Sequence, residues 1–181
     1  MHCPYCQSAI QEYTAECPQC GLSLEKLYRR YGPPAQALLN PVADLTGQVP
    51  PKELRRIENA AKALEQRFPQ ITFRVAIIDA DPEMPLPVTG CWLLNSRGIA
   101  SEMERGGRNR QILFLVDPDT RRAGFTIGYG LEPFIPVSAL EKAAGAGCAD
   151  FSQDQFCEGI CAALQALGDQ LAERCENLPR A

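Results

Sequence analysis

Residues 71–78 read ITFRVAII and residues 112–116 read ILFLV. Both stretches are short, almost entirely apolar and rich in β-branched side chains, which is typical of strands buried on both faces of a sheet. Residues 117–120, DPDT, form a turn signature, and residues 122–129 return as a third strand. The sequence therefore predicts two buried strands, the second of which continues into a hairpin.

Helices are expected on either side of these strands. Residues 51–68 place apolar side chains at helical spacing, start with prolines and are followed by Pro69. We expect two further helices, over residues 88–99 and 136–146. This order of helices and strands predicts an α/β domain in which helices cover a mixed sheet.

The last helix has the clearest start signal in the chain. Ser152 is placed to cap it, Gln155 to reach back in a capping box, and Phe151 to pack against Phe156. Its predicted buried stripe consists of Ile160, Leu164, Leu167 and Leu171.

Four cysteines in the first twenty residues have the spacing of a metal site. Cys3 and Cys6 form one CxxC pair, and Cys17 and Cys20 form a second. Each pair can present two sulfurs from one tight turn, so together they predict a tetrahedral zinc site. Because four thiolates leave no open position for water, we expect this zinc to be structural.

The two turns of this predicted zinc ribbon differ at one position. Gly21, after the second pair, can adopt the positive φ that aims backbone N–H groups at the sulfurs. The matching residue after the first pair is Gln7, so we expect that turn to be strained or differently shaped.

The other five cysteines lack ligand spacing and are interpreted as buried small residues. They are Cys91, Cys148, Cys157, Cys161 and Cys175. So many free thiols favour a reducing compartment, and we expect the protein to be cytoplasmic.

The composition restricts the class of protein. The 181 residues carry a net charge of −4, and the ribbon itself is acidic, so nucleic-acid binding is not expected. No stretch approaches the roughly 20 apolar residues of a membrane-spanning helix, and no signal peptide is visible. We expect the zinc ribbon over residues 1–27, a linker segment over 28–39 and the main α/β domain over 40–176.

Several motifs of the main domain occur in an order that resembles the TPM domain family. These are residues 42–44 (VAD), Trp92 with residues 95–99 (NSRGI), the strand at 112–116, and residues 128–132 (GYGLE). The resemblance covers about residues 40–172. It implies a three-layer α/β/α sandwich with a Rossmann-like sheet, an acidic patch that binds divalent cations in some members, and weak acid phosphatase activity in others.

The chain also departs from the family pattern. Many members have a carboxylate shortly after GYGLE, whereas residues 133–137 read PFIPV. Many have an acidic or Asn-Gly element before the second strand, where residues 109–111 read NRQ.

Three carboxylates near strand ends, Asp44, Asp79 and Glu132, are the candidates for a Ca²⁺ or Mg²⁺ site, because ligands of open α/β sheets bind at strand ends. The alternative is that they are ordinary loop-end and capping residues. For Gly128 and Gly130 the alternative to ligand contact is a backbone requirement, and Tyr129 between them is interpreted as a core residue.

Two functions remain open at this point. The first is a non-enzymatic module in which the ribbon helps an α/β domain bind a partner protein during assembly or regulation of a larger complex. The second is a divalent-metal-dependent phosphatase with Asp44, Asp79 and Glu132 as ligands. The absence of a nucleophile motif and of a phosphate-binding glycine loop favours the first, so we assign no catalytic residue.

Overall fold

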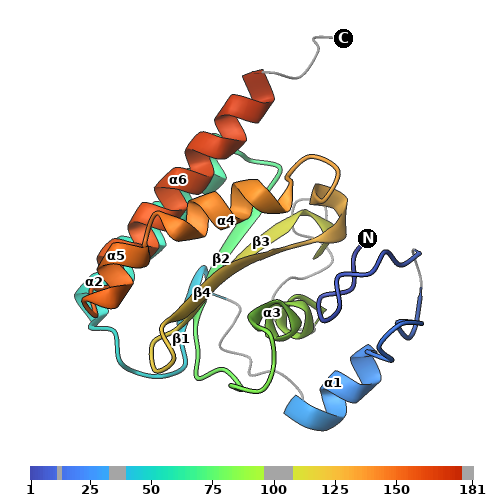
Figure 1. Ribbon diagram of the computed structural model, residues 1–181. Helices are drawn as coiled ribbons and strands as arrows, with labels where there is room; N and C mark the ends of the chain where they lie inside the picture. The colour runs from blue at the N-terminus through green and yellow to red at the C-terminus, as the bar shows by residue number, and fades with distance from the viewer. Residues whose placement is uncertain (12–13, 33–39, 96–107, 177–181) are drawn as a thin grey trace.

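The computed structural model describes residues 1–11, 14–32, 40–95 and 108–176. Within these residues four strands form one sheet in the order β1-β2-β3-β4. The first three strands are parallel and β4 is antiparallel to β3 (Figure 1), which confirms the predicted hairpin. The strands are β1 (Val42–Asp44), β2 (Thr72–Ile77), β3 (Gln111–Asp117) and β4 (Arg122–Ile127).

The two central strands are buried along their whole length. Every residue of β2 and β3 is shielded from solvent, whereas most of β4 is half-exposed. The two apolar runs of the sequence therefore form the central strands of the sheet, and β4, the hairpin partner of β3, lies at its edge.

Four helices of the described residues cover one face of the sheet (Figure 1). They enclose the larger core, in which the rings of Phe114 and Phe125 stack with their centroids 4.2 Å apart. The helices are α2 (Pro51–Arg67), α4 (Val137–Gly145), α5 (Cys148–Ser152) and α6 (Phe156–Glu176).

The opposite face is covered by α3 (Leu86–Asn95), beyond which lie the N-terminal segment and α1 (Leu24–Tyr31) (Figure 1). A second core cluster lies between α3 and the sheet. The Tyr31 ring at the end of α1 lies 5.1 Å from that of Trp92 on α3, and Arg30 binds Asp81 in the loop before α3. The arrangement is the α/β/α sandwich that the sequence and its resemblance predicted.

The final helix begins later than its start signal indicates. Ser152 is the last residue of α5, where its hydroxyl donates to the Ala149 carbonyl, and it does not cap α6. Asp154 then adopts a φ of 59°, which breaks the helix before α6 starts at Phe156. The predicted cap was therefore wrong, although the Phe151 and Phe156 rings do stack at 6.5 Å.

Two other predicted boundaries involve residues outside the described part of the chain. Helix α1 runs through residue 27, where the ribbon was expected to give way to a linker, and residues 33–39 lie outside the described residues. Helix α3 ends at Asn95, so the rest of the helix expected over 88–99 also lies outside them. None of the helices in the described part of the chain is long and apolar enough to cross a membrane.

Candidate functional site

The two CxxC pairs occupy two turns of the same shape. The N–H of Gln7 donates to the Cys3 carbonyl at 2.9 Å, and the N–H of Gly21 donates to the Cys17 carbonyl at 2.8 Å. Gln7 has a φ of 60° and Gly21 a φ of 70°. The first turn is thus not differently shaped: Gln7 enters the left-handed region that disfavours side chains, and the strain is real.

The four sulfurs converge to the size of a tetrahedral metal site. The sulfurs of Cys3 and Cys20 lie 3.6 Å apart, and those of Cys6 and Cys17 lie 3.7 Å apart. All four lie within 4.8 Å of one another. A tetrahedron with metal–sulfur bonds of about 2.3 Å has edges of about 3.8 Å, whereas a disulfide would need about 2.05 Å. All nine cysteines of the chain are free, so these four are available as metal ligands.

Hydrogen bonds prepare two of these sulfurs for deprotonation. The Ser8 hydroxyl lies 3.0 Å from the Cys6 sulfur and 3.5 Å from the Cys17 sulfur. This hydroxyl and backbone N–H groups lower the pKa of Cys6 and bring that of Cys17 to about 6. The N–H of Leu22 lowers the pKa of Cys20, but burial and the neighbouring thiols outweigh it and raise that pKa to about 12.

The pKa shifts of Cys17 and Cys20 have opposite directions because closely spaced thiolates repel one another, and a bound cation would offset that repulsion. Ser8 was not foreseen from the sequence. Its signal is its place two residues after Cys6, which corresponds to Leu22 after Cys20.

The three candidate carboxylates do not meet. Asp44 ends β1 and Asp79 follows β2, so both lie at the carboxyl edge of the parallel strands. Glu132 follows β4, which runs the other way, and it therefore lies at the opposite edge. Among the described residues, the cysteines form the only cluster of three or more ligand-type side chains close enough to hold a metal.

The contacts of each carboxylate support the loop-end interpretation. The Asp44 oxygens accept the N–H groups of Thr46, Gly47 and Val49 at 2.9–3.0 Å and so hold the loop after β1. Asp79 is exposed. Glu132 lies 3.9 Å from the imidazole of His2.

The GYGLE segment forms a short 3-10 helix, η3 (Tyr129–Leu131), after β4. A side chain on Gly130 would place its Cβ 2.8 Å from the Asn109 carbonyl oxygen. The backbone at residue 130 passes so close to Asn109 that this position requires glycine. Tyr129 is partly buried beside Cys91, and burial raises the pKa of its phenol. These contacts support the backbone interpretation of the motif.

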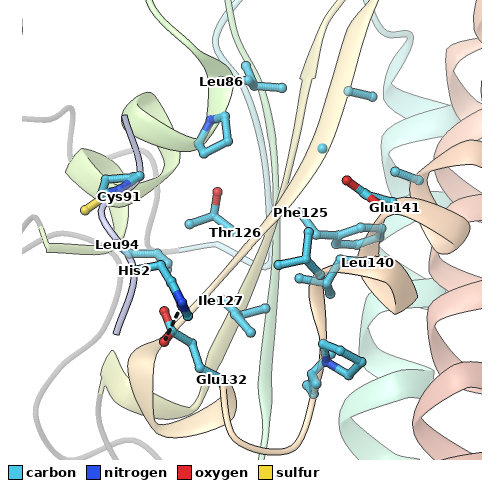
Figure 2. A pocket seen from close by; sticks show the side chains of 18 of the residues that line it. His2, Leu86, Cys91, Leu94, Phe125, Thr126, Ile127, Glu132, Leu140 and Glu141 are labelled. Atoms are coloured by element: carbon cyan, nitrogen blue, oxygen red, sulfur yellow. Dashed lines mark ion pairs between the residues drawn. The ribbon is translucent and has the colours of Figure 1, made fainter. Parts of the chain in front are cut away.

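A large groove runs along β4, and sequence reasoning did not predict it. Its volume is about 1490 Å³ and its lining is mostly apolar. Figure 2 shows Leu86 and Leu94 of α3 with His2 of the ribbon on one side, and Leu140 of α4 on the other. The groove depends on which strand becomes the sheet edge, and that is set by tertiary structure.

The fold and the cysteines together define an α/β domain that carries an N-terminal cysteine cluster able to hold a metal ion. The sequence profile of the TPM domain matches residues 42–170, most of the chain, and the chain belongs to this family. The match begins after the cysteine cluster, which is therefore outside it. No curated protein matches the chain.

Solved structures show the same fold. The N-terminal domain of a protein from P. gingivalis matches with a TM-score of 0.63 at 20% identity, over 83% of this chain and 95% of that one. The N-terminal domain of the cg2496 protein from Corynebacterium glutamicum gives 0.54 at 15%, over 78% and 84%. The BA42 protein from Bizionia argentinensis gives 0.53 at 14%, over 72% and 86%.

Proposed function

We propose that this chain is a protein-interaction module in which a structural zinc ion organises the ribbon and the groove along β4 receives the partner. The observation that carries the proposal is that the two features adjoin. His2, Pro4 and Gln7, which lie beside or within the first cysteine pair, also line the groove. A metal that fixes the ribbon would therefore fix one wall of the binding surface.

The donor set supports zinc as the metal. Four thiolates at tetrahedral separations favour zinc, and they exclude the oxygen-seeking cations Ca²⁺ and Mg²⁺. With four protein ligands the ion has no position for substrate, so its role is structural. Thiolate ligands and free cysteines also support a reducing compartment such as the cytoplasm.

The groove suits a macromolecular partner better than a small molecule. Its volume of about 1490 Å³ exceeds the roughly 300–1,000 Å³ of small-molecule sites. Phe134 and Val137, next to one end of it, are 60% and 62% exposed, and exposed apolar side chains beside a groove are typical of protein contacts. No contact among the described residues favours the phosphatase hypothesis, since Glu132 lies at the other edge of the sheet from Asp44 and Asp79.

Site-specific photo-crosslinking tests the proposal. The zinc-loaded full chain would carry a photoreactive residue at Val137, beside the groove, or at the exposed Lys52 on α2 as the matched control. We expect protein adducts from position 137 that are absent from position 52 and are lost after metal removal. The same adducts from both positions, or none, would contradict an interaction role for the groove.

A further inference from the structure

The free edge of β4 carries a row of backbone groups that another strand could pair with. The N–H of Gly128 donates to the Gln111 carbonyl at 2.8 Å, which fixes the phase of the ladder between β3 and β4. Hydrogen-bonded pairs alternate along an antiparallel ladder, so Ala123, Phe125 and Ile127 turn their N–H and C=O groups away from β3. Within the described residues, no other backbone or side chain bonds these groups.

This edge is accessible yet confined. Natural sheets shield a free edge with charges, prolines or a covering element. Here the edge runs through the groove, between α3 on one side and α4 on the other (Figure 2). A second folded sheet would meet both helices, whereas a single extended segment fits between them.

The walls specify the side chains of such a segment. Side chains of a strand alternate between the two faces of the sheet. One row would meet Leu86 and Leu94 on α3, which are 8% and 4% exposed, and the other would meet Leu140 on α4, which is 8% exposed. The segment should therefore be apolar on both faces.

The charges of the lining add one further requirement. Figure 2 shows the Glu141 carboxylate on α4 turned towards β4, and Glu141 has no ion pair among the described residues. The other charged carboxylate and guanidinium groups among the described lining residues already have partners: Arg121 binds Asp154, Arg122 binds Asp117, and Glu132 lies 3.6 Å from the amino group of Met1. Among the described lining residues the one uncompensated charge is thus negative, and a lysine or arginine in the segment would complement it.

We infer that the groove binds an extended peptide segment of a partner protein by strand addition to β4, and that this segment is apolar on both faces with one basic side chain over Glu141. The inference rests on the proposed interaction function and names the class of partner. Backbone hydrogen bonds to the edge would supply affinity, and the two walls and Glu141 would supply specificity.

The test uses linear nonapeptides displayed on phage and selected against the zinc-loaded full chain. The best peptide is synthesised and its Kd is measured by fluorescence anisotropy. Ala123→Pro removes one outward N–H but spares the ladder to β3, and should weaken binding about tenfold or more, whereas the matched control Ala123→Val should change it less than about twofold. Glu141→Lys should weaken basic peptides by about tenfold.

A second measurement keeps the wild-type chain and so does not depend on a variant that folds. N-methylation of successive peptide residues should weaken binding at every second position, because only alternate N–H groups face β4. Peptides that compete at the groove without this alternation would overturn strand addition and leave the interaction function intact.

Three other results would also overturn the inference. The first is that the selected peptides do not photo-crosslink at Val137, and the second is that no peptide can be selected. The third is a dimer of the chain alone that Ala123→Pro dissociates, since the occupant would then be a second copy. If no partner protein is crosslinked at position 137, the proposed interaction function itself is contradicted.

Discussion

The N-terminal ribbon and the α/β domain are stabilised in different ways. In the described part of residues 1–32, the buried apolar side chains are Cys3, Cys17 and Leu27, and two of these three belong to the cysteine cluster that could hold a metal ion. The α/β domain instead buries a large cluster around Phe114. A segment with so little core needs a metal to fold, whereas the domain does not. The two regions should therefore respond to different perturbations.

The largest effect is expected from Cys17→Ser. Structural zinc contributes about 10–16 kcal/mol in small zinc-binding peptides, so loss of one ligand should abolish metal binding and unfold the ribbon. We expect the zinc content to fall from one ion per chain to none. Hydrogen exchange should lose protection at the ribbon amides but retain it in β2 and β3.

Cys148→Ser is the matched control, because Cys148 is exposed and outside the cluster. It should keep its zinc and its ribbon protection. If Cys17→Ser also lowered the free energy of unfolding of the α/β domain by several kcal/mol, the two regions would form one cooperative unit and would not be stabilised independently.

The converse perturbation is Phe114→Ala in the domain core. Phe114 is fully buried and stacked on Phe125, so the lost burial and the cavity should cost about 3–5 kcal/mol. In a denaturant titration the helical circular dichroism should be lost earlier, while zinc release follows its original curve. Phe134→Ala, at a side chain that is 60% exposed, should move neither transition by more than about 0.5 kcal/mol. Joint movement of both curves would contradict independent stabilisation.

The sequence predicted what depends on local pattern. The CxxC spacing identified all four clustered cysteines, and the apolar runs identified β2 and β3, because burial on both faces leaves its mark on consecutive residues. Zinc, rather than another metal, stays a prediction.

What the sequence did not predict depends on contacts between distant segments. Glu132 lies away from Asp44 because β4 reverses direction, which no local pattern around Glu132 records. The sequence pattern misplaced the start of α6. Ser152 fits a capping pattern, but it is the last residue of α5 and therefore does not cap the helix that follows. The groove could not be predicted, because the sequence does not indicate which strand lies at the edge of the sheet.

A smaller effect compares the two turns within the ribbon. Gln7→Gly relieves a left-handed conformation that costs a side chain about 1 kcal/mol, so zinc affinity should rise about fivefold. Gly21→Ala should lower the affinity by a similar factor, because it introduces the same strain in the second turn. Competition with a chromophoric chelator measures both. Equal affinities for the wild type and both variants would show that turn strain does not limit the site.

The smallest effect concerns the contact between α1 and the domain. The Arg30 guanidinium, 2.7 Å from the Asp81 carboxylate, lowers the pKa of Asp81, an effect that burial opposes and the N–H of Glu83 reinforces. Because the pKa of Asp81 is lower in the folded state, the pairing stabilises the folded protein fully above the ordinary carboxyl pKa of about 3.9. This stabilisation is lost as the pH falls through the lower, folded-state pKa.

The single tryptophan, Trp92, reports on this contact because it lies against Tyr31 of α1. Wild-type and Asp81→Asn emission should differ near neutral pH and converge once the pH falls below the lowered pKa of Asp81, since protonated Asp81 and asparagine are both uncharged. Zinc release in acid affects both chains alike and cancels in the difference. A difference that persists unchanged to the lowest pH would show that the charge of Asp81 does not hold α1 in place.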